Sequence, residues 1–396
     1  MVLEGEFPPD IRVENEIKIL NQSGIEVVLA CLDKKNANTE SNKGKLFQIN
    51  RKKINSLLFN LRTNNITFPL YAKWWSNFLN KIFEKQNQFD YIHAHDLPML
   101  RVLHKIGITK HYKTIVDLHE NYPYAIQSYD WATNFPNRYL VRPKCWSKIE
   151  QKLLRKAAKI IVLSENFKNY LINKYSYLKN DQIIIYPNVP DLDIYYNQNK
   201  TIISLNNKKK LPVITYFGNI AKRRGIITAF ESLRILLEEG YKLKLLLIGP
   251  INKRENEIFG AYFNDPKIKD YIDYIKWIDI KDLHAYLKLS DICISPIIKN
   301  EQHESGVANK VFQYMMFGKP VIVSNCKPQA KVIQEENCGL VFESENPEDM
   351  AMKIKKLITN TDLIKAMGAN AQTAILEKYN TAIMGKNLVN FYKMNT

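Results

Sequence analysis

The sequence predicts an α/β protein built from two doubly wound, parallel-sheet domains. Short β-branched runs alternate with longer helical patterns, and most of the short runs are apolar throughout, as is typical of parallel strands covered on both faces. The series breaks once, in the polar, lysine-rich segment Asp191–Lys210, which has the composition of a linker. We therefore expect a first domain over residues 1–195, a second over 196–380, and a final helix over 381–396 that packs back toward the first domain.

Each element is expected where one of these runs lies. The first strand, at Met1–Leu3, is short enough to indicate a truncated start, and it leads into a loop over residues 4–10. The other expected strands are Glu26–Cys31, Tyr91–Ala94, Thr114–Leu118, Ile160–Leu163, Ile183–Tyr186, Val213–Phe217, Lys244–Ile248, Ile275–Ile278, Ile292–Ser295 and Pro320–Val323. The clearest helical stretches are Arg12–Ser23, Trp146–Ala158, Ile226–Glu239, Val311–Phe317 and Thr381–Lys393.

Composition excludes several classes of protein. With 396 residues, 45% of them hydrophobic and 24% charged, the chain is neither disordered nor fibrous. Its five cysteines are odd in number and form no C-x-x-C pair, which argues against a disulfide framework or a structural zinc site. Cys31, Cys293 and Cys326 are expected to be small buried hydrophobes. We see no signal peptide and no apolar run of about 18 residues, so we expect a cytoplasmic protein that meets a membrane only peripherally, at its inner face.

The net charge of +17 favours an anionic partner. Residues 43–85 are the most unbalanced stretch, with Glu84 as their one acid against Lys43, Lys45, Arg51, Lys52, Lys53, Arg62, Lys73, Lys81 and Lys85. Interleaved apolar side chains (Leu57, Leu58, Phe59, Trp74, Trp75, Phe78) suit an anionic bilayer interface. The alternative, buried aromatics with solvated cations, stays equally open. No nucleic-acid-binding module is visible, so we expect no nucleic-acid partner.

Polar residues directly after strands are the candidate site, because ligands of open parallel sheets bind beyond the carboxyl ends of the strands. In the first domain these residues are His95 and Asp96 after one strand, and His119 and Glu120 after the next. His119 could orient or deprotonate a substrate hydroxyl, or it could be a hydrogen-bonded wall residue. Metal ligation by His93, His95 and His119 is a weaker alternative, because strand alternation turns only the first two to one face.

The loop at residues 4–10 precedes the first expected helix. Gly5 is expected to form a turn at the floor of the site, and Asp10 to cap the helix. Arg12 either reaches a phosphate or supports Asp10, and the sequence does not choose between these roles.

Two segments of the second domain have the chemistry of an anion site. Gly218 and Asn219 follow a strand, and Lys222, Arg223 and Arg224 precede Gly225 at a helix start, where a diphosphate would bind. An ordinary strand–helix turn with surface cations is the alternative.

The second segment runs from Glu301 to Lys310 and contains Gly306, whose neighbouring amides could bind phosphate or sugar hydroxyls. Lys310 can pair with phosphate, and Gln313 could hydrogen-bond ribose hydroxyls. The aromatic and Met residues that follow Lys310 have the spacing of a helix core.

Taken together, these motifs resemble the family 4 retaining glycosyltransferases of the GT-B fold. The resemblance rests on FPPDIRVENE, GIEVVLACLD, YIHAHDLPML, TIVDLHENYP, AKIIVLSENF, IIYPNV, YFGNI…RRG, SDICISPI, HESGVANKVFQYMMFGKPVIVSN and NCGLVF, which span nearly the whole chain. It implies two Rossmann-like domains that face each other across a cleft, with a C-terminal helix that crosses back. It also implies transfer of a sugar from a nucleotide-sugar with retention, without a metal or other cofactor.

The resemblance assigns roles to single positions. It implies catalytic roles for His119, Glu304 and Arg224. The donor would be bound by Gly218, Asn219, Arg223, Arg224, Ser305, Gly306, Val307, Asn309, Lys310 and Gln313. The acceptor side would comprise Gly5, Arg12, His95, Asp96, His119 and Glu120.

Three departures from the family pattern matter. Gln313 replaces the second of two glutamates usually separated by seven residues, and Glu304 stands one place off the first. Asn219 replaces a common arginine, and the first loop lacks paired glycines.

The expected function is transfer from a UDP- or GDP-sugar to a glycan or lipid-linked acceptor in bacterial surface polysaccharide synthesis. A non-catalytic scaffold or partner subunit, and a nucleotide-sugar epimerase, are the alternatives.

Overall fold

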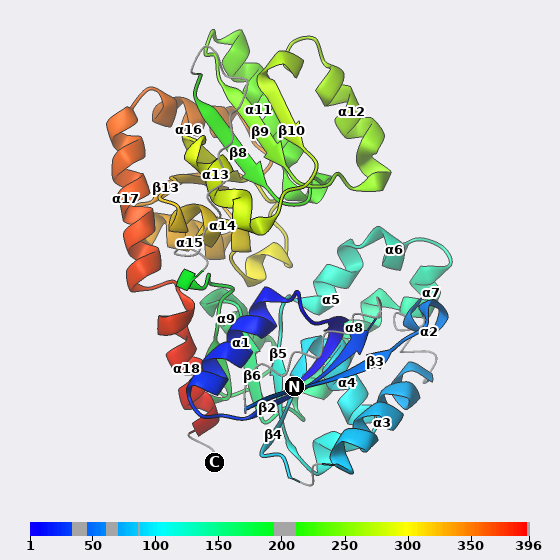
Figure 1. Cartoon of the computed structure of the whole chain (residues 1–396). Coiled ribbons are helices and arrows are strands. Elements are labelled where there is room, and N and C mark those ends of the chain that lie inside the picture. Colours follow the sequence, from blue (N-terminus) through cyan, green and yellow to red (C-terminus); the bar gives the residue numbers. More distant parts are fainter. Residues whose placement is uncertain (34–45, 61–69, 86–87, 194–210, 394–396) are drawn as a thin grey trace. The chain divides into compact units, whose positions relative to one another are not determined.

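The computed structural model describes residues 1–33, 46–60, 70–85, 88–193 and 211–393 of the chain. They form two compact units. Unit 1 comprises Met1–Pro187 and Gly385–Thr396, and unit 2 comprises Asn188–Met384. The expected boundary at Tyr195 and most of the expected linker lie outside the described residues. The last helix, α18 (Thr381–Lys393), begins in unit 2 and belongs to unit 1 from Gly385 onward (Figure 1).

Unit 1 is built on a parallel sheet of seven strands in the order β3-β2-β1-β4-β5-β6-β7. The strands are β1 (Val2–Glu6), β2 (Val27–Asp33), β3 (Phe47–Lys53), β4 (Tyr91–His95), β5 (Lys113–Asp117), β6 (Lys159–Val162) and β7 (Ile183–Ile185). The helices are α1 (Ile11–Gln22), α2 (Ser56–Asn60), α3 (Leu70–Phe83), α4 (Asp96–Lys105), α5 (Tyr122–Ala125), α6 (Asp130–Thr133), α7 (Asn137–Val141), α8 (Trp146–Leu154) and α9 (Glu165–Lys174).

Helix α1 carries Arg12 and packs over the part of unit 1 that contains the candidate site. Its start is fixed by Asp10, which accepts a hydrogen bond from the Val13 amide, so the predicted cap is confirmed. Glu14 completes the cap by accepting from the amide of Asp10. Ile19 of α1 packs against Gly385 of α18, where a Cβ atom would lie only 2.7 Å from the Ile19 side chain. The last helix therefore rests directly on the first.

Unit 2 is built on a parallel sheet of six strands in the order β10-β9-β8-β11-β12-β13. The strands are β8 (Val213–Phe217), β9 (Lys244–Ile248), β10 (Ile272–Ile275), β11 (Ile292–Ser295), β12 (Val321–Ser324) and β13 (Gly339–Phe342). The helices are α11 (Ile226–Glu238), α12 (Asn256–Asn264), α13 (Leu283–Lys288), α14 (Asn309–Met316), α15 (Lys327–Glu335), α16 (Pro347–Ile358) and α17 (Thr361–Glu377).

Both faces of the second sheet are covered, as the apolar strands predict. Ile292 and Ile294 of β11 pack in the core beneath α11 and α16, whereas Cys293 between them packs beneath α14 and α17. Cys31, Cys293 and Cys326 are all free thiols in the interior, which confirms the expected role of these cysteines.

Two expectations about single elements are wrong, and two strands were missed. The strand expected at Ile275–Ile278 lies at Ile272–Ile275, because β10 is a half-exposed edge strand without a continuous apolar run. The edge strand β3 was not predicted, since Phe47 is its one buried residue. Gly5 lies inside β1 and not in a turn, because the first strand continues to Glu6. The short strand β13 was also missed.

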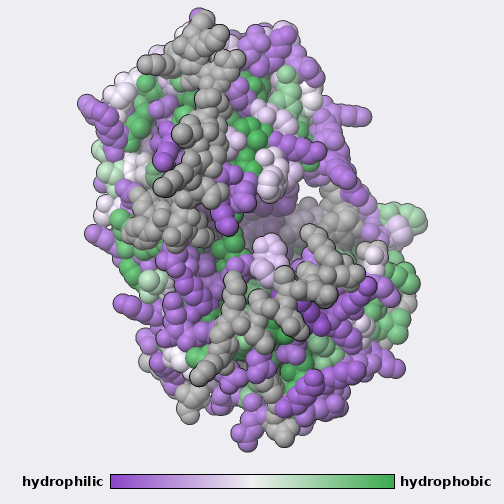
Figure 2. Space-filling view, viewed as in Figure 1, coloured by the Kyte–Doolittle hydropathy of each residue, from purple (hydrophilic) through white to green (hydrophobic). Residues whose placement is uncertain are grey.

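The face of the molecule in Figure 2 is mostly hydrophilic, with apolar side chains in small patches. Within the described ranges, none of the helices combines the length and the apolar character that crossing a bilayer requires.

Candidate functional site

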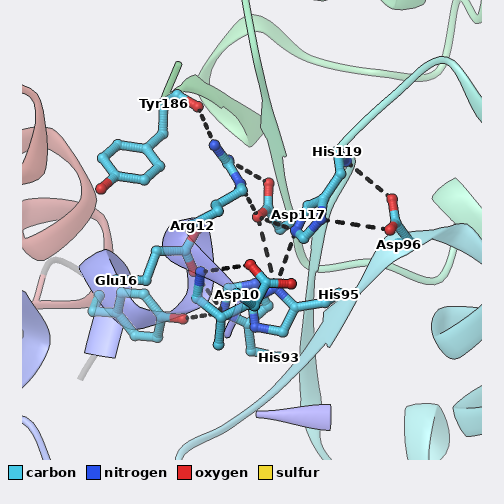
Figure 3. A network of polar contacts seen from close by, with 11 residues as sticks. Asp10, Arg12, Glu16, His93, His95, Asp96, Asp117, His119 and Tyr186 are labelled. Atoms are coloured by element: carbon cyan, nitrogen blue, oxygen red, sulfur yellow. Dashed lines mark hydrogen bonds and ion pairs between the residues drawn. The ribbon is translucent and has the colours of Figure 1, made fainter. Parts of the chain in front are cut away.

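The carboxyl ends of β4 and β5 bring most of the predicted residues of unit 1 together. The two strands are neighbours, with His95 paired in register with Asp117. Asp96 and His119 follow directly, and α1 contributes Arg12 from above (Figure 3). The result is one network of side chains that are mostly buried.

Arg12 is the centre of this network. Its Nε and Nη2 atoms each lie 2.6 Å from an oxygen of Asp117, and Nη1 donates to the carbonyl of Tyr186 at 2.9 Å. Burial alone would raise the pKa of Asp117, but Arg12 and then His119 outweigh it and hold that pKa well below its usual range. Arg12 therefore holds Asp117 at the end of β5, a pairing that the sequence analysis did not name.

His119 is held between two carboxylates. Its Nε2 lies 2.9 Å from Asp117 Oδ2, and its Nδ1 lies 3.5 Å from Asp96 Oδ2. The Asp96 carboxylate also accepts from the backbone amide of His119 at 3.0 Å. Burial opposes a charge on the ring, but Asp96 and Asp117 raise the pKa of His119 to about 10. With both nitrogens engaged, the ring in this arrangement is a hydrogen-bond donor and cannot accept a proton from a hydroxyl.

Beneath His119 lies a layer of completely buried polar residues. His95 Nδ1 is 3.2 Å from His119 Nε2, and the ring of His93 stacks on that of His95 with centroids 4.4 Å apart. His93 Nδ1 is 2.6 Å from the hydroxyl of Tyr392 on α18, and Glu16 of α1 lies 4.0 Å from the same nitrogen. Burial lowers the pKa of His95 to about 4, so its ring is neutral at pH 7.

Two further residues were predicted for the acceptor side. Glu120 accepts a hydrogen bond from the Tyr129 hydroxyl at 2.9 Å. Gly5 lies in β1, with an ordinary contact to Leu3.

In unit 2, the ends of β8 and β9 and the start of α14 form a second cluster. The amide of Gly218 donates to the carbonyl of Ile248, and Gly218 has a positive φ of 129°. A Cβ atom at this position would lie 2.8 Å from the amine of Lys310. That amine stands 3.6 Å from the centre of the Tyr216 ring. The glycine therefore leaves room for a buried lysine over an aromatic face.

Arg223 and Arg224 lie within electrostatic range of Lys310. Burial, then Arg224 and Arg223, hold the pKa of the Lys310 amine well below its usual range. The carbonyl of Arg223 accepts from the amide of Ile298, which ties the turn Lys222–Arg224 to the strand end after β11. Among the described residues, no carboxylate forms an ion pair with Lys310. Such a set of cations is typical of an anion site.

The remaining predicted donor residues lie in the loop before α14 and on α14 itself. Glu304 accepts from the amide of Lys327 at the start of α15, and Ser305 donates to the carbonyl of Gln302. Gly306 is extended, Val307 is buried, and Asn309 and Gln313 lie on α14 one turn apart. Phe312, Tyr314, Met315 and Met316 are buried, as predicted for core residues.

His303 is a residue to which the sequence analysis assigned no role. Its Nδ1 donates to the carbonyl of Ile298 at 2.6 Å, and burial lowers its pKa to about 4. Sequence reasoning also missed Glu16, Tyr186 and Tyr392, and it gave no role to Asp117. A buried aspartate at the end of an apolar strand is the one signal that could have pointed to a partner such as Arg12.

Some residues of the basic stretch at 43–85 make contacts within unit 1. Arg51 donates to the carbonyl of Phe7, and the amine of Lys52 lies 4.8 Å above the Trp74 ring. Trp75 and Phe78 are buried in the core, whereas Leu57 is 73% exposed. Buried aromatics were one of the two alternatives, and they hold for Trp75 and Phe78. Lys43, Lys45 and Arg62 lie outside the described residues.

Two family models match consecutive parts of the sequence. The model "Glycosyltransferase Family 4" matches residues 11–194, and "Glycosyl transferases group 1" matches residues 197–374.

Two curated relatives and one solved structure show how far the similarity extends. An uncharacterised glycosyltransferase of Methanocaldococcus jannaschii is 27% identical over 237 residues, which are 59% of this chain and 57% of the relative. The capsular polysaccharide biosynthesis glycosyltransferase CapM of Staphylococcus aureus is 26% identical over 180 residues, 46% of this chain and 45% of CapM. The chain thus spans about half the length of these relatives. The structure of Anabaena HepE in complex with UDP superposes with a TM-score of 0.71 at 12% identity, over 99% of both chains.

Proposed function

The chain belongs to the family 4 glycosyltransferases of the GT-B fold, and from that premise we propose that it transfers a sugar from a UDP- or GDP-linked donor to a hydroxyl of a glycan or lipid-linked acceptor. The cationic cluster of unit 2 carries this proposal. Lys310, Arg223 and Arg224 gather beside Gly218, at the carboxyl end of β8. A nucleoside diphosphate is a ligand of matching charge for this position.

The chemistry of the leaving group supports the same assignment. As the bond between sugar and diphosphate breaks, negative charge grows on the diphosphate, and fixed cations stabilise that charge without having to reorganise. We propose that Arg224 and Lys310 do this without a metal at the diphosphate, and that the anomeric configuration is retained. Glu304 would contact the donor sugar, although one of its oxygens already caps α15.

Unit 1 supplies the acceptor side in this proposal. His119 would donate a hydrogen bond to a sugar hydroxyl through Nδ1, because this nitrogen lies 3.5 Å from Asp96, whereas Nε2 lies 2.9 Å from Asp117 and its N–H is held there. Because the ring is charged in this arrangement, neither nitrogen is available as a base. Asp117, Arg12 and Asp96 fix the position of the ring. The geometry therefore favours the orienting role of His119 over the deprotonating one.

The relatives support a role in surface polysaccharide synthesis. CapM is named for capsular polysaccharide biosynthesis, and HepE was solved with UDP. We propose a cytoplasmic enzyme that meets a lipid-linked acceptor at an anionic membrane surface through residues 43–85. The exposed Leu57 and the exposed lysine side chains of α3 are the described features that suit such a surface.

The first experiment measures thermal stabilisation of the protein by UDP, GDP, ADP and dTDP, with and without EDTA. A nucleotide at about 100 times its dissociation constant stabilises the fold by about 2.7 kcal/mol, which gives a measurable shift. The nucleotide that stabilises the protein then identifies the sugar donors to assay. We expect Arg224→Ala to lose most turnover and Lys355→Met, which removes an exposed cation elsewhere in unit 2, to retain it. Normal turnover of Arg224→Ala would refute the assignment.

A non-catalytic scaffold is the second candidate function, and the uncharged Gln313 and Asn219 favour it. This candidate predicts nucleotide-sugar binding without transfer or hydrolysis. An epimerase would instead convert the donor without any acceptor. Analysis of the products by mass and anomeric configuration separates these outcomes and tests retention.

A further inference from the structure

A group of potential metal-ligand side chains lies within unit 1, on α1, β4 and β5. One potential ligand atom from each of Glu16, His93, His95 and Asp117 lies within 4.8 Å of the other three, and all four residues are buried. His93 and His95 alternate along β4 and share a face of the sheet, with Glu16 on the helix above that face (Figure 3). Three elements of the fold thus converge on one point.

Several atoms of this group have no protein partner. Among the described residues, neither oxygen of Glu16 has a partner at standard hydrogen-bond geometry, and neither do the Nε2 atoms of His93 and His95. Burial and the neighbouring Asp117 carboxylate raise the pKa of Glu16 well above its usual range. The nearest cation to Glu16 is Arg12, at 3.4 Å, and Arg12 already makes two shorter contacts with Asp117. Buried polar atoms are nearly always paired with protein, water or an ion, so four such atoms in one place require an explanation.

The remaining nitrogen of each histidine is held by a neighbour. Nδ1 of His93 contacts the Tyr392 hydroxyl at 2.6 Å, and Nδ1 of His95 contacts Nε2 of His119 at 3.2 Å. Histidines that bind metals usually have this arrangement, in which one ring nitrogen is oriented by a hydrogen bond and the other is available as a ligand. Arg12 and His119 orient the carboxylate of Asp117 in the same way.

We propose that Glu16, His93, His95 and Asp117 form a buried binding site for a divalent ion of the zinc class. Two imidazoles and two carboxylates are a ligand set that zinc accepts in tetrahedral geometry, whereas calcium and magnesium prefer oxygen ligands. Bonds of about 2.0–2.1 Å require ligand atoms roughly 3.4 Å apart, which small side-chain adjustments would achieve.

Tyr392, which contacts His93, also lines a cavity of about 370 Å³. Tyr392 and Tyr91 line the cavity together with the carboxylates of Glu26 and Asp90, which would attract a cation. The hydroxyl of Tyr392 reaches His93 from the cavity wall. A change in the rotamer of Tyr392 would therefore connect the cavity with the cluster.

The test uses the untagged full chain, stripped with a chelator, incubated with Zn²⁺ and freed of loose metal by gel filtration. We expect one zinc per chain by metal analysis. Glu16→Gln and His93→Gln should lose it, whereas His104→Gln, which replaces a histidine that bonds Thr109 elsewhere in unit 1, should retain it. Tyr392→Phe should lower the zinc affinity about 10-fold while the ring still fills its place.

Absence of zinc from the wild type, or equal zinc in Glu16→Gln, His93→Gln and the wild type, would overturn the proposal. If the substituted proteins do not fold, the test is the visible absorption spectrum of the wild type loaded with Co²⁺. An intense visible spectrum of four-coordinate cobalt supports the site, and the weak spectrum of six-coordinate cobalt contradicts it.

Discussion

Arg12 and Asp117 form a buried, two-pronged ion pair that joins α1 to the end of β5, with both N–O distances at 2.6 Å. Removing the arginine would leave the Asp117 carboxylate buried without its main partner. We expect Arg12→Met to lower the free energy of unfolding by about 3–5 kcal/mol. Urea denaturation in the presence of EDTA measures this change. The double variant Arg12→Met/Asp117→Asn should lose less than the sum of the single variants, and simple additivity would contradict the pairing.

Gly218 in unit 2 has a positive φ and lies beside the amine of Lys310. An alanine there would have an unfavourable φ of 129° and a Cβ atom 2.8 Å from the Lys310 amine. We expect Gly218→Ala to cost about 1–3 kcal/mol of stability and to weaken nucleoside diphosphate binding, because Lys310 must move. Gly260→Ala is the matched control, since that glycine lies within α12 with nothing near its Cβ. The control should be neutral or stabilising by about 0.5–1 kcal/mol.

Substitution of Gln313 tests whether this residue binds the ribose of the donor. We expect Gln313→Ala to weaken UDP or GDP binding by roughly 3- to 10-fold, the worth of one hydrogen bond, and to leave pyrophosphate binding unchanged. Calorimetric titration with the nucleotide and with pyrophosphate measures both. An equal loss for the two ligands would mean that Gln313 acts through the position of α14 and not through the ribose. Gln313→Glu keeps an acceptor and should retain more affinity than the alanine variant.

The burial of His303 predicts that the free energy of unfolding depends on pH. Its pKa in the folded protein is about 4, against about 6.5 for an ordinary histidine, because burial disfavours its charged form. The unfolded chain therefore binds the proton first, so this contribution to stability is present above about pH 6.5 and is lost as the pH falls toward 4. The loss is on the order of 2–3 kcal/mol. Relative to His303→Gln, the wild type should lose more free energy of unfolding between pH 7 and pH 4. Parallel curves for the two proteins would contradict this.

Much of the fold could be predicted because the relevant signals are local. The strands at Val213–Phe217, Lys244–Ile248 and Ile292–Ser295 and the helix at Thr381–Lys393 have the predicted bounds. Buried parallel strands are apolar on both faces, so their signal survives in a single short run. The edge strands β3 and β10 face solvent on one side, and their sequences lack that signal.

The two-sheet architecture, the strand-end positions of His95, Asp96, His119 and Gly218, and the helix-start position of Lys310 could all be predicted from the sequence. Short apolar runs predict the strands, apolar residues repeated every 3.6 positions predict the helices, and the side chains directly after each run predict the site. Which of these groups face one another depends on the tertiary structure. Arg12 and Asp117 are 105 residues apart, and His93 and Tyr392 are 299 apart. Such pairs depend on the order of strands in the sheet and on the helix that covers them, and no local spacing encodes either.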